Sequence, residues 1–297
     1  MDWAFFFQQI IFGLTLGCFY SLLAIGYTMV YGVLRLINFA HGDLLMVSAY
    51  IAFFGIIIFR IPWPLAFVGA LALTGVLGIL IDRGAYRPLR QSPRISCLIT
   101  AIGVSFLLEN LGLVVIGGRP KSFPKPELFD GVLLLGGVRI PYLSIWAFMV
   151  TAALLLMVLL IVHRTRIGMA MRALSRDIET VRLMGVDSDR VISFTFALGS
   201  VLAAAGGIMW CMKYPALEPF MGVVPGIKAF VAAVLGGIGS VAGAALGGML
   251  LGLAEILIVA VRPEWSGYRD AIAFGILLVI LLTRPAGILG EDLDERA

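Results

Sequence analysis

Few residues of this chain have the types and spacing that catalysis or metal binding requires. The two histidines, His41 and His163, lie on separate predicted loops, and neither has a nucleophile or a set of ligands near it in the sequence. The three cysteines lie in apolar stretches without metal-ligand spacing, which is typical of inert buried thiols. No G-x-x-x-x-G-K-S/T loop occurs, so the chain lacks a Walker-type nucleotide site. We therefore expect no catalytic residue, no metal and no cofactor in this chain.

Two carboxylates fall inside long apolar runs, where an ionisable side chain is costly. Glu109 lies in the run 95–117 and Glu255 in the run 227–261. An ionisable residue inside a membrane usually marks a substrate or ion pathway, so both are candidates for a functional site. The alternative is that each one makes a buried polar contact or lies near a helix end. Both interpretations stay open at this stage.

Glycine makes up 35 of the 297 residues, and the excess gathers in the regions 26–42 and 226–252. Broken helices are tolerated in a membrane only where they are buried in protein or line a watery cavity. Paired glycine-interrupted segments in the two halves of a chain point to a transport path. The predicted path residues are Asn38, His41, Asp43, Gly236, Gly237, Gly239 and Ser240. Alternatively, glycines only let helices approach closely, as in the G-x-x-x-G pairs Gly243/Gly247 and Gly248/Gly252.

The elements that position these residues must be membrane helices. Hydrophobic residues make up 61% of the chain and charged residues only 13%, with a mean hydropathy of +1.03. Soluble domains have about 45–50% apolar and about 25% charged residues. A soluble enzyme, a nucleic-acid-binding protein and a disordered chain are therefore excluded. About 20 apolar residues cross a bilayer once, and the candidate runs are 7–33, 44–59, 64–81, 95–117, 142–162, 191–212, 227–261 and 268–283.

These runs predict an all-α fold, a polytopic membrane helical bundle in a single domain over residues 1–297. About eight or nine transmembrane segments are expected, with a glycine-broken or re-entrant segment near 227–261. The loops 82–94 and 163–190 are rich in arginine, which favours a cytoplasmic location for both, and the loop 118–141 is then external. The sidedness of the N-terminus stays open, because it depends on how the glycine-broken region crosses.

The predicted cytoplasmic loop 163–190 is too polar to span but carries the pattern of a short amphipathic helix. Apolar residues recur near helical spacing at Ala173, Leu174, Ile178, Val181 and Met184. Gly185 is a natural C-terminal stop, and Asp187 or Ser188 can cap the following span. Such a helix either lies on the lipid headgroups or docks into a groove of a cytoplasmic partner.

Part of this loop resembles a motif of ABC importer permeases. The segment 179–185 (ETVRLMG) is similar to their E-A-A-x-x-x-G loop, with Glu179 and Gly185 matching the motif and Thr180 and Val181 replacing its two alanines. Three other segments resemble branched-chain amino acid permeases of the LivH type: 34–43 (LRLINFAHGD), 234–240 (VLGGIGS) and 284–290 (RPAGILG). The resemblance covers essentially the whole chain in the same order.

The resemblance implies a multi-pass permease subunit of the bacterial inner membrane, with branched-chain amino acids as the expected substrate. It implies a homologous permease subunit, two ATP-binding cassette subunits and a periplasmic substrate-binding protein as partners in the lipid bilayer, and no nucleic acid. ATP and magnesium would bind to the ATPase subunits, and the external loop 118–141 could face the binding protein. The expected coupling residues are Arg176, Asp177, Glu179, Val181, Met184 and Gly185.

Other interpretations remain beside this one. Within the same class, urea and short-chain amide permeases are similar. In another class, a stand-alone ion-coupled secondary transporter would use Glu109 and Glu255 as its coupling site. A membrane scaffold without a transport role would leave the glycine-broken segments unexplained.

Overall fold

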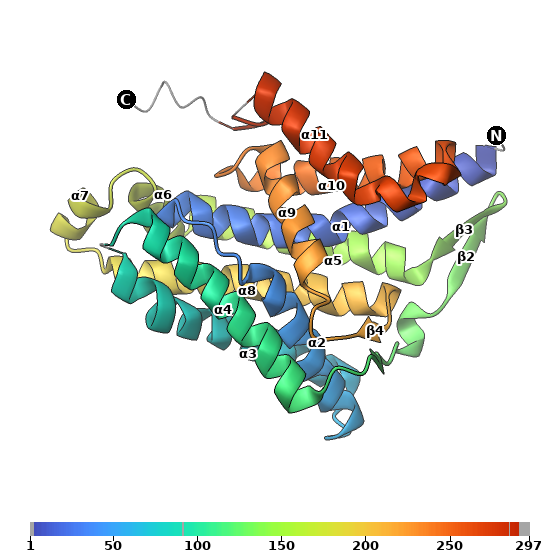
Figure 1. Ribbon diagram of the computed structural model, residues 1–297, viewed down its shortest axis with the longest axis horizontal. Helices are drawn as coiled ribbons and strands as arrows, with labels where there is room; N and C mark the ends of the chain where they lie inside the picture. The colour runs from blue at the N-terminus through green and yellow to red at the C-terminus, as the bar shows by residue number, and fades with distance from the viewer. Residues whose placement is uncertain (1–2, 91, 285, 291–297) are drawn as a thin grey trace.

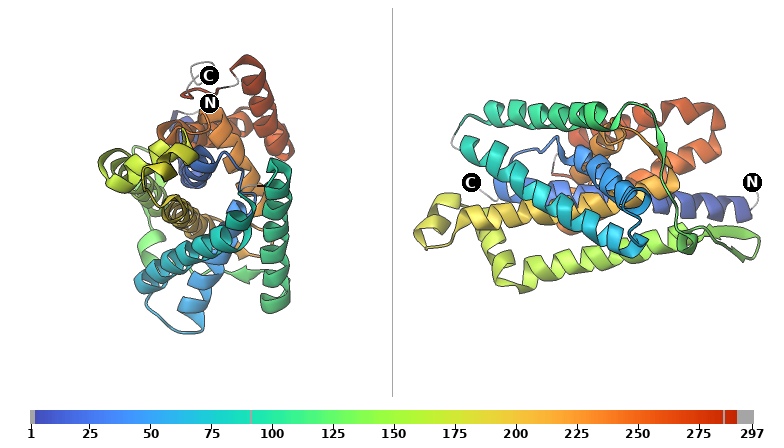
Figure 2. Two further views of the ribbon diagram at one scale, coloured as in Figure 1. Left: turned by 90° about the vertical axis from the view of Figure 1, so that its left-hand side faces the viewer. Right: turned by 90° about the horizontal axis from the view of Figure 1, so that it is seen from below.

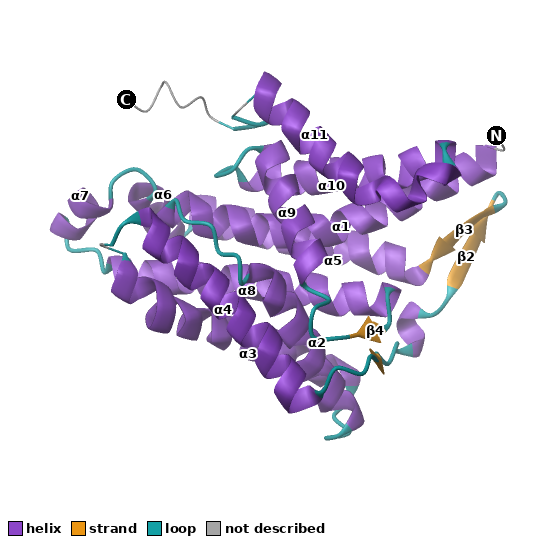
Figure 3. Ribbon diagram, in the orientation of Figure 1, coloured by secondary structure: helices purple, strands orange, loops and turns teal. Residues whose placement is uncertain are grey.

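The computed structural model describes residues 3–90, 92–284 and 286–290 and is almost entirely helical (Figures 1 and 3). Seven helical segments in these residues are long and apolar enough to cross a membrane. They contain α1 (Trp3–Leu34), α3 (Trp63–Ile81), α4 (Arg94–Ile116), α5 (Tyr142–Arg164), α8 (Ser188–Lys213), α10 (Val241–Val261) and α11 (Arg269–Thr283). Two shorter apolar helices are α2 (His41–Ile57) and α9 (Val223–Gly236).

Each predicted apolar run coincides with one of these helices, and the run 227–261 divides into α9 and α10. The predicted polytopic bundle of about eight or nine segments is therefore confirmed, with seven long helices and two short ones in the described residues. The chain breaks after α9 because Gly237 and Gly239 have φ angles of 106° and 103°. Glycine adopts this region without the steric cost that other residues meet.

Helix α1 runs through the interior of the bundle (Figure 2), and all of its residues from Thr15 to Val30 are buried. It packs mainly against α10, α8, α9 and α5. Gly248 and Gly252 of α10 lie directly on the backbone of α1, so that a methyl group at either position would overlap with the main chain. In the same way, Gly243 and Gly247 lie on the backbone of α9. Both G-x-x-x-G pairs thus serve close helix packing.

The loop 118–141 lies at one end of the bundle, together with the N-terminus (Figure 1). Strand β1 (Lys121–Ser122) pairs antiparallel with β4 (Ala216–Leu217), and β2 (Val132–Leu135) forms a hairpin with β3 (Val138–Pro141). The 3₁₀ helix η3 (Glu127–Phe129) packs the Phe129 ring against Trp63 and Trp146. A second 3₁₀ helix, η4 (Pro263–Tyr268), links α10 to α11.

The opposite end of the bundle carries the loop 163–190, which folds into α6 (Arg166–Leu174) and α7 (Ile178–Leu183). The expectation of one continuous amphipathic helix is wrong, because Asp177 starts a new helix. Its carboxylate accepts hydrogen bonds from the backbone N–H groups of Glu179 and Thr180, at 2.9 and 3.1 Å, and so satisfies the free donors of the first turn of α7. As predicted, Gly185 ends this segment, with φ 81°, and Asp187 caps α8.

The apolar helices run back and forth between the two ends of the bundle, and their order determines at which end each loop lies. The N-terminus lies at the end of the loop 118–141, and residues 286–290 lie toward the end of α6 and α7 (Figure 1). The arginine distribution predicts a cytoplasmic location for α6 and α7. Combined with the observed path of the chain, the arginine distribution predicts an external N-terminus, which the sequence alone left open.

Candidate translocation path and coupling surface

The first predicted region, 26–42, is broken at the turn 35–40, which joins α1 to α2 and is termed the first break. Arg35 has a φ of 55°, so the chain leaves α1 abruptly at this residue. Asn38 is buried, and its Oδ1 accepts a hydrogen bond of 2.9 Å from the hydroxyl of Tyr86. His41 is also buried, with its ring centroid 4.6 Å from that of Tyr27. Its Nε2 has no hydrogen-bond partner among the described residues.

Helix α2 starts in direct contact with α9, in the middle of the bundle. Gly42 lies on the backbone of Gly222 and Gly226, which leaves no room for a side chain at any of the three. Asp43 is buried in the next position, and its Oδ2 accepts a hydrogen bond of 2.5 Å from Ser105 of α4. The first predicted path residues therefore lie where α1, α2, α4 and α9 meet.

The second predicted break, Gly236 to Ser240, is partly covered by the C-terminal segment 286–290. The backbone N–H groups of Ile288 and Leu289 donate to the carbonyls of Leu235 and Gly236, at 3.0 and 2.9 Å. Gly237 lies on the backbone of this segment, and Gly236 lies on α10. The absence of a side chain at these two glycines therefore allows the close backbone contacts on both sides of the break. Ser240 caps α10 by accepting a hydrogen bond of 3.1 Å from the N–H of Gly243.

A cavity joins the two breaks. The cavity is partly open, and the empty space in it and at its mouth amounts to about 210 Å³. It is lined by Tyr27, Thr28 and Tyr31 of α1, Phe230 and Ala233 of α9, and Ile37 and Ile238 from the two breaks. The hydroxyl oxygen of Thr28 is buried and has no partner in the described part of the chain. Gly239 follows Ile238 and is exposed, and a methyl group added to it would meet no described atom within 4 Å.

None of these lining side chains was predicted from the sequence. Ile37 and Ile238 adjoin the predicted residues Asn38 and Gly239, so proximity to the breaks was the available signal. Tyr27, Thr28 and Phe230 lie within apolar helices, where the sequence alone does not distinguish a cavity wall from a packed core.

The two intramembrane acids do not form one site. Glu109 is buried on α4, one turn after Ser105, and so lies near Asp43. Glu255 is buried on α10 and pairs with Lys228 of α9, with 3.0 Å between Nζ and Oε1. The hydroxyl of Tyr20 donates to both Glu255 oxygens, at 3.3 and 3.4 Å. Lys228 also pairs with Asp270 at the start of α11, at 2.7 Å.

This arrangement favours the packing interpretation for Glu255, because its charge is already matched by Lys228. Sequence reasoning missed Lys228, although a single lysine in the apolar segment 223–236 was a visible signal. A lysine and a glutamate that are both buried in a membrane protein are expected to pair. Within the described residues, no group of three or more His, Cys, Asp or Glu side chains could hold a metal ion.

The predicted coupling residues all lie on or beside α7. Val181 packs into the bundle, whereas Arg176, Asp177, Glu179 and Met184 are exposed. Leu183 and Met184 form an exposed apolar tip, with 88% and 78% of their surfaces accessible. The pKa of Asp177 lies below its ordinary value, because its carboxylate accepts hydrogen bonds from the hydroxyl and N–H of Thr180 and from the N–H of Glu179.

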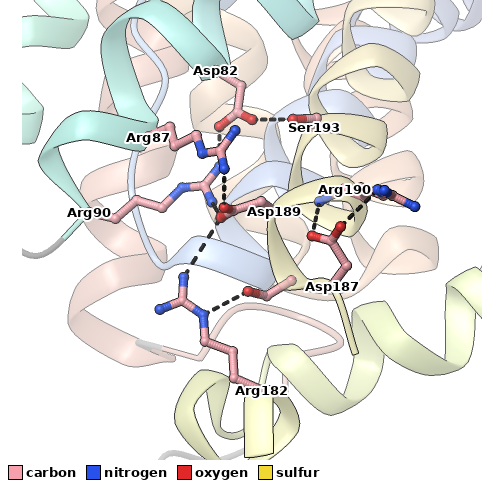
Figure 4. Close-up of polar contacts among 9 residues, drawn as sticks. Asp82, Arg87, Arg90, Arg182, Asp187, Asp189, Arg190 and Ser193 are labelled. Carbon is pink, nitrogen blue, oxygen red and sulfur yellow. Dashed lines mark hydrogen bonds and ion pairs between the residues drawn. The ribbon is translucent and has the colours of Figure 1, made fainter. Parts of the chain in front are cut away.

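An arginine–aspartate network joins α7 to the bundle (Figure 4). Asp189 of α8 pairs with Arg87 and Arg90, each at 2.5 Å, and with Arg182 of α7 at 3.7 Å. Arg90 also pairs with Asp82 at 2.5 Å, and the hydroxyl of Ser193 donates to the other oxygen of Asp82 at 2.6 Å. In the sequence these arginines are recognisable only as loop charges, because Asp189 lies far from Arg87 and Arg90 along the chain and only the fold brings them together.

Comparison with known proteins shows that most of the chain is similar to one family of permeases. The family described as "Branched-chain amino acid transport system / permease component" matches residues 9–281. The chain is 42% identical to the high-affinity branched-chain amino acid transport system permease protein BraD of Pseudomonas aeruginosa, covering 97% of each chain. It is 40% identical to the permease protein LivH of Escherichia coli, covering 98% of each chain.

A solved structure has a similar fold at low sequence identity. The structure titled PsaBC from Streptococcus pneumoniae in complex with Fab matches with a TM-score of 0.50 at 14% identity, covering 94% of this chain and 92% of that one. At this identity the match concerns the arrangement of the helices. It supports the polytopic helical bundle described above.

Proposed function

The chain belongs to the family of permease components of branched-chain amino acid transport systems, and from this premise we propose that it conducts branched-chain amino acids through the cavity between its two breaks. It is a multi-pass ABC permease of the bacterial inner membrane, and the family places the ATPase on other subunits. The sequence resemblance to this family is thereby confirmed, and the stand-alone ion-coupled transporter is not retained.

The observation that carries the proposed path is the cavity itself. Ile37 lies in the first break and Ile238 in the second, so both interrupted regions reach one space. Tyr27 and Phe230 give this space aromatic walls, with 6.1 Å between their ring centroids. An aliphatic side chain is favourably transferred to such walls, whereas urea would lose hydrogen bonds to water there. The lining therefore favours a branched aliphatic substrate over urea or a short amide.

The predicted path residues take different parts in this proposal. Asn38, His41 and Asp43 form the polar side of the first break, and Gly239 and Ser240 border the second. Gly237 accepts the C-terminal segment on its bare backbone, and Gly236 lies on the backbone of α10. The buried hydroxyl of Thr28, which has no partner among the described residues, offers a hydrogen bond to a polar group of the substrate.

The permease needs ATPase and binding-protein partners, as ABC importers do in general. In finer detail, we propose one homologous permease chain, two ATP-binding cassette subunits and a periplasmic binding protein. The exposed tip of Leu183 and Met184 would enter a groove of an ATPase subunit, with Arg176, Asp177, Glu179 and Gly185 around it. The external loop 118–141 would face the binding protein.

Uptake by the complete complex in proteoliposomes tests this function. We expect ATP-dependent uptake of leucine, isoleucine and valine, and no uptake of urea. In the variant Ala233→Leu, added side-chain volume in the cavity should obstruct the path and lower leucine uptake about tenfold, which corresponds to a transport barrier higher by roughly 1.4 kcal/mol. Ala72→Leu, on an exposed face of α3, is the matched control.

Uptake driven by an ion gradient without ATP would contradict the proposal. Equal uptake by the Ala233→Leu and Ala72→Leu variants would show that the substrate passes elsewhere.

A further inference from the structure

The arginine–aspartate network does more than attach α7 to the bundle, because it continues to the turn 35–40 at the cavity. We propose that Arg182, Asp189, Arg90, Asp82, Tyr86 and Asn38 form a polar relay that transmits movements of α7 to this turn. Asp82, Arg90 and Tyr86 are then positioning residues for transport. This inference rests on the proposed function, since it assumes that α7 receives the ATPase and that the turn borders the path.

The relay starts on α7 itself. Arg182 lies one residue after Val181, and its Nε donates to the hydroxyl of Ser188 at 2.7 Å. Its NH2 group lies 3.7 Å from Asp189. Both partners are in the first turn of α8. A displacement of α7 therefore acts first on the N-terminal turn of α8 (Figure 4).

The second step crosses from α8 to the segment that follows α3. Arg90 bridges two carboxylates, Asp189 and Asp82, each at 2.5 Å. The Asp82 side chain is fully buried, and only 10% of the Arg90 side chain is accessible. A buried ion pair is costly to separate, because each charge left alone lacks both water and a partner. The pair should hence stay intact when the surrounding elements move.

The third step runs along the π-helix η1 (Asp82–Tyr86), which is followed by the 3₁₀ helix η2 (Arg87–Leu89). π-Helical turns are rare and occur frequently at functional sites. Here the turn places Asp82 in the network and Tyr86 against the first break. The Tyr86 ring packs on Phe196, with 5.1 Å between the centroids, and its hydroxyl donates to Asn38 at 2.9 Å.

The relay ends beside the cavity. Tyr86 and Asn38 are 1% and 2% exposed, so water does not compete for their hydrogen bond. Asn38 is adjacent to Ile37, which lines the cavity. A shift of Tyr86 would thus move the cavity wall through a single peptide unit.

A second, direct connection runs from the turn to the α6–α7 link. The guanidinium of Arg35 donates to the carbonyl of Ser175 at 3.4 Å, in an exposed position. A long, exposed hydrogen bond contributes less than the shorter, buried contacts of the relay. The two routes make different predictions, because Arg35→Ala cuts only the direct one.

The test measures how many leucine molecules enter proteoliposomes per ATP hydrolysed by the complete complex. Tyr86→Phe and Arg90→Gln each interrupt the relay, and both should lower this ratio between about twofold and thirtyfold, the range of measured coupling effects. Two variants serve as matched controls. Tyr50→Phe removes a buried hydroxyl that has no partner in the described residues. Arg83→Gln removes an exposed arginine of the same π-helix. Both controls should keep the wild-type ratio.

A double variant separates the relay from a purely structural role. Tyr86→Phe leaves the Asn38 amide buried without its donor, which also costs stability. Adding Asn38→Leu removes that buried polar group and should restore the unfolding temperature of the complex, while the transport ratio stays low. Recovery of the ratio together with stability would overturn the relay.

Two further results would also overturn the relay. One is a wild-type ratio in both single variants. The other is a reduced ratio in Arg35→Ala alone, which would favour the direct route. Absence of ATP-dependent leucine uptake by the wild-type complex would instead refute the proposed function.

Discussion

Replacement of Lys228 by methionine tests whether Glu255 serves packing or transport. Lys228 matches the charge of Glu255 at 3.0 Å, and the two side chains are only 7% and 3% accessible. Without Lys228, the hydroxyl of Tyr20, at 3.3 Å, is the one partner that the carboxylate keeps among the described residues. Methionine has a similar length and adds no polar group, so the change isolates the loss of charge.

The size of the effect follows from burial. Removal of one partner of a buried pair costs about 3–5 kcal/mol, because the other charge remains buried. Asp270 is 59% accessible and can return to water, so its separation adds little. The Tyr20 hydrogen bond retains part of the stabilisation. We therefore expect Lys228→Met to lower the free energy of unfolding by about 3 kcal/mol.

The second half of the test removes both charges. Lys228→Met combined with Glu255→Leu removes both charges of this buried pair, and apolar pairs often replace buried ion pairs at little cost. The double variant should therefore unfold within about 1 kcal/mol of wild type. If Glu255 serves packing, the double variant should also retain ATP-driven leucine uptake.

Titration with sodium dodecyl sulfate in detergent micelles measures the unfolding free energy, and proteoliposome uptake measures transport. Asp270→Asn is the matched control, since it removes the exposed carboxylate alone. A stable double variant without uptake would refute the packing interpretation and assign Glu255 to the transport cycle. A single variant as stable as wild type would refute the argument from burial.

Three further predictions concern the second break and α7. Gly237→Leu should prevent residues 286–290 from covering α9 and abolish assembly or uptake, as measured by complex yield and leucine transport; wild-type behaviour would show that the cover is dispensable. Replacement of Glu179, or Gly185→Ala at a φ of 81°, should impair uptake, whereas membrane insertion and affinity for the binding protein should persist. Normal transport in both variants would contradict the coupling role of α7. Because the pKa of Asp177 is lowered, its cap stabilises α7 fully at a pH above the ordinary pKa of 3.8, and this stabilisation is lost as the pH falls through the lowered pKa. Hydrogen exchange of residues 178–183 should show this loss in wild type and not in Asp177→Asn. Identical pH profiles of the two proteins would contradict the capping argument.

Most of the fold could be predicted from the sequence because lipid imposes a simple rule on it. A span needs about 20 apolar residues, and the runs of this chain coincide with its helices. The division of the run 227–261 was visible in Gly237 and Gly239. The separation of α6 from α7 was not predicted, because hydrophobic periodicity continues across Asp177 although its carboxylate starts a new helix.

The candidate site could be predicted only in part. The breaks at Asn38 and Gly239 were located because glycine and polar residues cluster there at the ends of apolar runs. The cavity wall, such as Phe230, was not, since apolar residues look alike in a sequence. The contacts of Lys228 and Arg90 join distant parts of the chain, and only the fold brings their partners within reach.

The cover of α9 by residues 286–290 also has a consequence for the biogenesis of the protein. The carbonyls of Leu235 and Gly236 are matched by Ile288 and Leu289, which lie about 50 residues later in the chain. At roughly 5–20 residues per second, a ribosome takes about 3–10 s to synthesise this interval. During that time the end of α9 is inserted without its donors, and an unsatisfied carbonyl is costly in lipid. Completion of the second break therefore waits until Ile288 and Leu289 have been synthesised, and a nascent chain that stops before Ile288 would leave these two carbonyls without their donors.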